Sequence, residues 1–81
     1  MSTDIKILGA GCDKCSRLYE MAVEAVRLTG TDAKITKVSS MSEIIALGVM
    51  TTPAIVINGQ IMTTGRVPDL DEIKKMIADA T

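Results

Sequence analysis

Two short stretches of the chain alternate apolar with polar residues. Residues 4–8 and 34–38 follow this pattern, and both are rich in β-branched side chains. A period of two places the apolar side chains on one face of an extended backbone. We therefore predict a strand at each stretch.

Between these stretches the apolar residues recur three or four positions apart, which is the spacing of one face of a helix. The series starts near Cys12 and stops before Gly30, a residue type that commonly follows the end of a helix. We predict a helix that begins at or just before Cys12 and reaches Thr29. A strand, a helix and a strand in this order form a right-handed parallel unit.

A second, shorter helix is predicted after residue 40. Ser40 and Glu43 have the spacing of a capping box, in which the two side chains satisfy the first backbone N–H groups of a helix. Gly48 then marks the end of this helix.

The last part of the chain predicts a hairpin and a third helix. Residues 54–57 form an apolar run, and Asn58-Gly59 is a strong signal for a two-residue turn into a return strand at residues 60–63. Asp69 precedes an amphipathic stretch and is the predicted N-cap of the final helix.

These elements describe an α/β domain. Their order is βαβαββα, and no repeat, low-complexity segment or linker divides residues 1–81. The first two strands are expected to be parallel, whereas strands joined by a tight hairpin are antiparallel. We therefore predict a single domain with a mixed sheet.

The composition limits the partners of this domain. Nine basic and ten acidic residues give a net charge of −1, so no basic surface indicates nucleic acid or an anionic membrane. No apolar run is long enough for a membrane span, and the first residues lack the basic and apolar regions of a signal peptide. We expect a cytoplasmic monomer that binds neither nucleic acid nor membranes.

The candidate chemistry centres on two cysteines. The sequence contains Cys12, Cys15 and no histidine. The absence of histidine excludes a Ser-His or Cys-His nucleophile pair, and also a zinc site of two cysteines and two histidines. In a cytosolic chain, a disulfide is usually transient and catalytic.

A redox interpretation gives the two cysteines different roles. At the N-terminus of the predicted helix, unpaired N–H groups and the helix dipole stabilise a thiolate at Cys12, and such placement lowers a cysteine pKa from about 8.5 to roughly 3.5–7.5. Cys12 is therefore the predicted attacking thiolate. Cys15 lies one turn later on the apolar face and is the predicted resolving thiol. Asp13 and Lys14, between them, carry opposite charges.

A metal-binding interpretation uses the same two thiolates. Two sulfur ligands suit Cu(I), whereas zinc normally needs four ligands and would require a second chain. A soft-metal carrier or binding module is therefore the alternative function. A redox sensor that docks another protein in one oxidation state is a third hypothesis, and a pair of inert core cysteines is the simplest one.

Three features together resemble the thioredoxin superfamily. They are the Cys12-to-Cys15 motif after a first strand, Thr52-Pro53 before a third strand, and the hairpin at Asn58. The resemblance is strongest to small thioredoxin-like or glutaredoxin-like redox-active disulfide proteins. It implies a minimal thioredoxin-like fold, with a four-stranded mixed sheet in the order 2-1-3-4 and helices on both faces.

The same resemblance implies a function. A thiol–disulfide oxidoreductase exchanges a Cys12–Cys15 disulfide with protein substrates and needs no other cofactor, because a separate reductase, similar to the flavoprotein thioredoxin reductase, supplies the electrons. The family's proline is cis and lies against the disulfide, which implies a cis Thr52–Pro53 bond. The backbone at Thr52 would then pair with an extended substrate segment.

The rival family is the heavy-metal-associated metallochaperone, which also has two such cysteines after its first strand. That family usually has methionine two positions before the first cysteine, where this chain has Ala10, and its last element is a strand rather than a helix. Both differences favour the redox family.

The chain departs from ordinary thioredoxins near the motif. Gly11 replaces the usual tryptophan, and Asp13-Lys14 replaces the usual Gly-Pro pair. The position of the family's buried acid falls on or near Lys6, whose positive charge would lower the pKa of a neighbouring thiol. The alternative interpretation of Lys6 is a surface lysine with a solvated ammonium.

Two residues before the last helix complete the candidate site. Gly65 is a predicted point of close approach between the backbone and the active face, since glycine has no side chain. Arg66 is interpreted as a solvated side chain, with an acidic group of a partner as the alternative contact. The stretch only partly matches the glutathione-binding turn of glutaredoxins, so glutathione is not a predicted ligand.

Overall fold

The computed structural model describes residues 3–9 and 13–80. Its elements have the predicted order and nearly the predicted limits. They are β1 (Thr3–Leu8), α1 (Asp13–Thr29), β2 (Ala33–Val38), α2 (Met41–Ala46), β3 (Ala54–Ile57), β4 (Gln60–Thr64) and α3 (Leu70–Ala80). None of the described helices combines the length and the apolar character that crossing a membrane requires.

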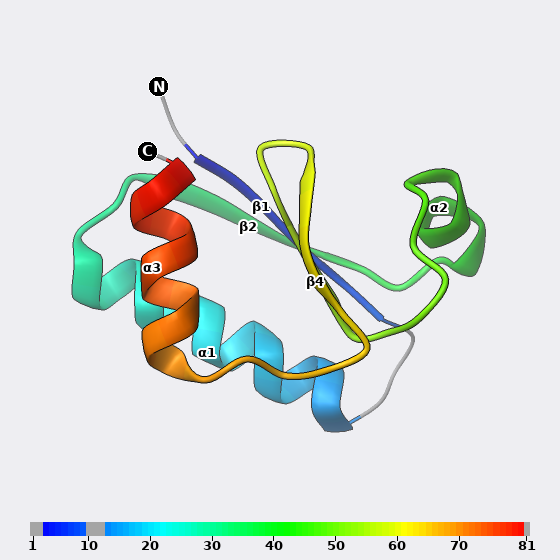
Figure 1. The fold of residues 1–81 in the computed structure, drawn as a ribbon, viewed down its shortest axis with the longest axis horizontal. Coiled ribbons are helices and arrows are strands. Elements are labelled where there is room, and N and C mark those ends of the chain that lie inside the picture. Colours follow the sequence, from blue (N-terminus) through cyan, green and yellow to red (C-terminus); the bar gives the residue numbers. More distant parts are fainter. Residues whose placement is uncertain (1–2, 10–12, 81) are drawn as a thin grey trace.

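The strands form one mixed sheet in the order β2-β1-β3-β4 (Figure 1). β1 is central and pairs in parallel with β2, where Ile5 lies opposite Ile35. On its other side β1 pairs antiparallel with β3, where Ile5 lies opposite Ile57, and β4 continues antiparallel to β3. The predicted α/β fold and its sheet order are therefore confirmed.

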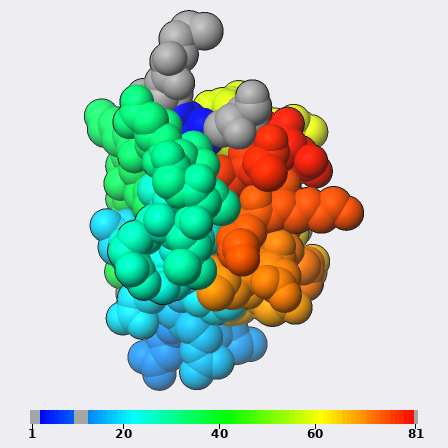
Figure 2. Space-filling model, turned by 90° about the vertical axis from the view of Figure 1, so that its left-hand side faces the viewer, coloured from blue at the N-terminus to red at the C-terminus, as the bar shows by residue number. Residues whose placement is uncertain are grey.

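Each face of the sheet carries its own apolar core. α1 and α3 cover one face and lie side by side there (Figure 2), whereas α2 belongs to the other face. Successive residues of a strand point to opposite faces, so Ile7 belongs to the first core and Leu8 to the second. The second core consists of Leu8, Val38, Ile44, Val49, Ala54 and Val56.

The hairpin between β3 and β4 turns at the predicted dipeptide. Asn58 and Gly59 both have positive φ values, 52° and 81°, as the twist of a two-residue hairpin requires. The Asn58 side chain also accepts a hydrogen bond from the Asp4 N–H (2.9 Å) and donates one to the Ala80 carbonyl (3.3 Å). The turn therefore links the start of β1 to the end of α3.

One predicted helix cap is present and the other is absent. The carboxylate of Asp69 accepts a hydrogen bond from the Glu72 N–H at 2.9 Å, which confirms the cap of α3. Ser40 is the N-cap of α2, but its side chain makes no capping bond, so the predicted capping box is wrong. The Glu43 side chain lines a groove beside β2 instead of reaching back to Ser40.

Candidate functional site

Gly9 and Cys15 meet where the carboxyl end of β1 faces the first turn of α1. The Cys15 side chain is fully buried, and the Gly9 N–H donates a 2.9 Å hydrogen bond to the Val38 carbonyl. A Cβ built on Gly9 would lie 2.0 Å from Sγ of Cys15. The sulfur therefore packs directly against the Gly9 backbone, in space that any other residue would fill with its side chain.

The loop before β3 brings Thr52 and Pro53 to the same place. The Cβ position of Gly9 lies 4.0 Å from Cβ of Thr52. Pro53 is almost fully buried, and the peptide bond between Thr52 and Pro53 is cis. Thr52 itself is exposed. This loop therefore contributes one buried residue, Pro53, and one solvent-accessible residue, Thr52.

Gly65, just after β4, lies beside this loop. Its N–H donates a hydrogen bond to the Pro53 carbonyl at 2.9 Å. Its φ is +75°, and a Cβ built on it would lie 3.3 Å from Oγ1 of Thr51. The structure thus brings Cys15 and Thr52 to Gly9, and places Gly65 against the adjoining Thr51 and Pro53.

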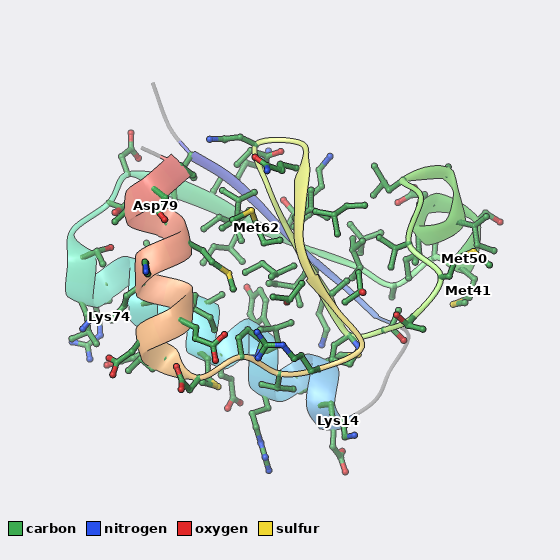
Figure 3. The ribbon with its side chains drawn as sticks, in the orientation of Figure 1. Lys14, Met41, Met50, Met62, Lys74 and Asp79 are labelled. Atoms are coloured by element: carbon green, nitrogen blue, oxygen red, sulfur yellow. The ribbon has the colours of Figure 1, made fainter. Side chains whose placement is uncertain are left out.

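Cys15 is disulfide-bonded in the structure. The other cysteine of the sequence is Cys12, and the predictions for Cys12 and Gly11 lie outside the described residues. Asp13 and Lys14 are exposed in the first turn of α1, and Figure 3 shows Lys14 at the outer tip of that helix. Within residues 3–9 and 13–80, no group of three or more cysteine, aspartate, glutamate or histidine side chains is placed to hold a metal ion.

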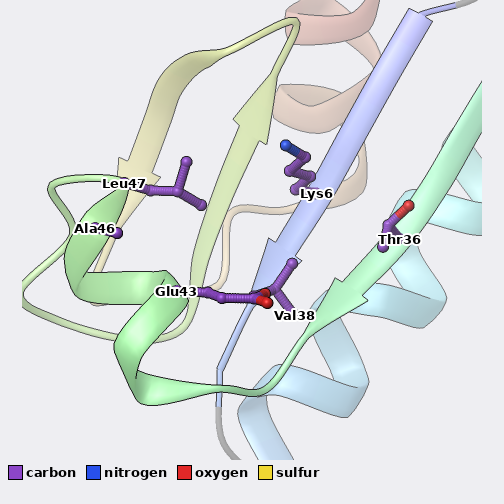
Figure 4. A pocket seen from close by; sticks show the side chains of 6 residues that line it. All are labelled: Lys6, Thr36, Val38, Glu43, Ala46 and Leu47. Atoms are coloured by element: carbon purple, nitrogen blue, oxygen red, sulfur yellow. The ribbon is translucent and has the colours of Figure 1, made fainter.

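Lys6 lies on the face of the sheet opposite α1. It lines an open groove of about 360 Å³ together with residues of β2 and α2, among them Thr36 and Ala46 (Figure 4). Its ammonium lies 3.9 Å from a carboxylate oxygen of Asp4, which is nearer the start of β1, and the Lys6 side chain is 37% exposed. The ion pair between Lys6 and Asp4 therefore lies on the side of Lys6 that is farther from Gly9.

Residues 3–78 match the thioredoxin domain family. The chain belongs to the thioredoxin family. A thioredoxin of Methanothermobacter thermautotrophicus is 36% identical over 74 residues, which cover 91% of this chain and 96% of that relative. A thioredoxin of Methanocaldococcus jannaschii is 41% identical over 71 residues, which cover 88% of this chain and 81% of the relative. These relatives support a thioredoxin-like redox protein.

Solved thioredoxin structures share the fold at low sequence identity. Chloroplastic thioredoxin z superposes with a TM-score of 0.77 at 17% identity, covering 98% of this chain and 78% of that one. The oxidised thioredoxin of Plasmodium falciparum gives a TM-score of 0.68 at 19% identity, covering 96% of this chain and 80% of that one. The thioredoxin fold is therefore reached here with few identical residues.

The side chain of Arg66 contacts another residue of this chain and is not surrounded by solvent alone. Its guanidinium forms an ion pair with the Glu72 carboxylate of α3 at 2.6 Å. This hydrogen bond and charge lower the pKa of Glu72 and raise the pKa of Arg66. The interpretation as a solvated side chain is corrected to this extent: Arg66 contacts an acid of its own chain, next to Gly65.

Gly9 is a residue of the candidate site, within the described part of the chain, that the sequence does not reveal. It reads as a glycine that ends the first strand, like many others. Only the structure shows that the sulfur of Cys15 lies against it. A requirement for a small residue three places before the first cysteine would have identified Gly9. No pattern along this chain contains that requirement.

Proposed function

We propose that this protein is a thiol–disulfide oxidoreductase that reduces disulfides of other proteins through Cys12 and Cys15. One observation carries the proposal. The buried sulfur of Cys15 lies at the end of the central strand, packed against Gly9 and close to Thr52. A thiol that is buried in this way can exchange with a sulfur brought to it within the protein, but it is not accessible to a reagent in solvent.

The proposed reaction has two exchange steps. The Cys12 thiolate attacks one sulfur of a substrate disulfide, which forms a mixed disulfide and releases the other substrate sulfur as a thiolate. The Cys15 thiolate then attacks the Cys12 sulfur. This step forms the Cys12–Cys15 disulfide and releases the second substrate thiolate. Two electrons and two protons pass from the protein to the substrate in total.

Burial supports the division of roles between the cysteines. Cys15 is 0% exposed, and a disulfide in a folded substrate needs an accessible thiolate to reach it. A buried thiol can attack only a sulfur that is brought to it within the same complex. Cys15 is therefore assigned as the resolving thiol, and the first attack falls to Cys12.

The surface around the site supplies the proposed substrate contacts. Thr52, Gly65, Asp13 and Lys14 are all exposed, and Thr52 directly precedes the loop proline that leads into β3. An extended substrate segment would pair with the backbone at Thr52. Gly11 completes the proposed contact surface.

The proposal needs no bound cofactor, because the electrons reside in the two sulfurs. A separate reductase, for which a flavoprotein of the thioredoxin reductase type is the natural candidate, would restore the dithiol. We propose that this cycle takes place in the cytoplasm, where thiols are kept reduced.

The first experiment measures the reduction of a protein disulfide by dithiothreitol with catalytic amounts of this protein. Wild type should accelerate the reaction, and Cys12→Ser and Cys15→Ser should each lose at least about 10²-fold of that acceleration. Cys15→Ser should in addition accumulate mixed disulfides through Cys12, because the resolving attack is missing.

Two results would contradict the proposal. Equal activity of both serine variants and wild type would remove the cysteines from the reaction, and mixed disulfides trapped through Cys15 in Cys12→Ser would reverse the roles. Stoichiometric Cu(I) binding by a wild-type protein without exchange activity would favour the soft-metal carrier instead.

A further inference from the structure

We infer that Gly9 is a positioning residue for the resolving cysteine, and that its missing side chain sets how readily the disulfide of Cys15 forms. The inference rests on the proposed function for its biological meaning. Its physical basis is independent of any substrate. The Sγ atom of Cys15 occupies the space where a Cβ at position 9 would stand.

Space, rather than backbone conformation, requires glycine at this position. Gly30, Gly48, Gly59 and Gly65 have positive φ values, which favour glycine for conformational reasons. Gly9 is not among them. A Cβ built on Gly9 would lie 2.0 Å from Sγ and 2.9 Å from Cβ of Cys15, where contacts under 3.0 Å essentially do not occur. Replacing Gly9 by alanine therefore tests the contact with Cys15 alone.

The backbone on both sides of the contact is held in place. Gly9 follows Leu8, which is paired with Val38 of β2 and Ala54 of β3, and the Gly9 N–H bonds to the Val38 carbonyl. Cys15 belongs to α1, whose buried face continues through Leu18 and packs in the core beneath the sheet. Neither backbone can recede cheaply, so the Cys15 side chain must absorb an added methyl group.

The side chain of Cys15 has this freedom in only one redox state. In the dithiol, rotation about the Cα–Cβ bond can move Sγ to another staggered position. In the disulfide, Sγ is bonded to a second sulfur and rotates only if that bond is distorted. A methyl group at position 9 therefore destabilises the disulfide more than the dithiol. The variant should be a stronger oxidant than wild type.

The test is the equilibrium between this protein and dithiothreitol. Protein disulfide and reduced dithiothreitol exchange two electrons and two protons to give protein dithiol and oxidised dithiothreitol, and the oxidised fraction is measured by thiol alkylation across a series of redox buffers. Gly9→Ala should shift the equilibrium toward the dithiol at least about tenfold, which corresponds to about 30 mV for a two-electron couple.

Gly48→Ala is the matched control. Gly48 has φ +88° and no heavy atom within 4 Å of a built Cβ, so alanine there strains the backbone equally in both redox states. Its equilibrium should stay within about twofold of wild type. A folded Gly9→Ala protein with an equilibrium like that of Gly48→Ala would overturn the inference.

A second variant decides the case in which Gly9→Ala does not fold. In a Cys15→Ala background the colliding sulfur is gone, so adding Gly9→Ala should cost clearly less stability than it costs in oxidised wild type. An equal loss in both backgrounds would show that Sγ is not the reason for glycine, and would overturn the inference. Loss of the proposed function is a separate outcome, because it would appear as wild-type protein without exchange activity, whatever the equilibrium constants are.

Discussion

Lys6 shows how the placement of one charge limits its effect on the site. Its ammonium lies beside the Asp4 carboxylate on a partly exposed side chain, on a different face of the sheet from α1. Water screens a charge in such a place. A contribution of Lys6 to the thiol chemistry is therefore long-range and small.

The prediction for Lys6→Ala is a small rise in the pKa of the Cys12 thiol, because a positive charge that favours the thiolate is removed. The rate of alkylation by iodoacetamide across a pH series measures this pKa. Lys75→Ala, on exposed α3 surface, is the control and should leave the pKa unchanged. A rise of more than one unit would mean that Lys6 acts directly on the site, and no rise would remove it from the site.

At the scale of single residues, a role that follows from spacing along the chain can be predicted from the sequence, whereas a role that follows from proximity in space cannot. Cys15, Thr52 and Pro53 were identifiable as candidate site residues because the spacing of motifs along the chain marks them. Gly9 was not, because its role depends on a sulfur that approaches it in space. The partner of Arg66 was missed for the same reason, since Glu72 lies on the next helix.

α2 is the element with the weakest attachment to the sheet. Among its six residues only Ile44 is buried, at 1% exposure, whereas Ile45 is 60% exposed. The second core thus receives one side chain from this helix, together with Val49 from the loop that follows. Stability of the whole α2 region depends on very few apolar contacts.

Ile44→Ala should therefore destabilise the protein by about 2–5 kcal/mol, because it leaves a cavity among Leu8, Val38 and their neighbours. Ile45→Ala, next to it on the exposed side, should change the free energy of unfolding by only about 0.5 kcal/mol. Urea denaturation of both variants measures the difference. Similar losses for the two variants would contradict the burial pattern of α2.

Local sequence patterns predict the bounds of the helices and strands to within a residue or two. The exception is a helix cap. The order of strands and helices follows from apolar periodicity, and the hairpin follows from Asn58 and Gly59. The capping box of α2 did not follow, because the side chain of Glu43 is placed along the groove by the sheet beside it. A spacing rule along the chain contains no information about that neighbour.

At the scale of the whole molecule, the site and the hairpin turn occupy opposite ends of the central strand. Gly9 follows the last residue of β1, whereas the side chain of Asn58 bonds to Asp4 near its beginning and to Ala80 at the end of α3. Asn58 therefore joins three elements at the end of β1 that is farther from Gly9 and Cys15. Its contribution should be to stability and not to exchange chemistry.

Asn58→Gly tests this separation, because glycine keeps the positive φ of the turn and removes only the side-chain bonds. The variant should lose about 1–2 kcal/mol of unfolding free energy, as expected for two modest hydrogen bonds. Its disulfide equilibrium with dithiothreitol should match that of wild type. Asn58→Asp, which retains an acceptor for Asp4 and no donor for Ala80, should lie between the two in stability. A shifted equilibrium in Asn58→Gly would show that the two ends of the molecule are coupled.

The hydrogen bonds of the Asn58 side chain also affect how this domain could be inserted into a larger protein. Since β1 starts and α3 ends beside the same side chain, a host chain would enter and leave the domain at almost one point. Domains with neighbouring ends tolerate insertion into a surface loop of another fold. In such a fusion, the other end of β1, where Gly9, Cys15 and Thr52 meet, would lie away from the host.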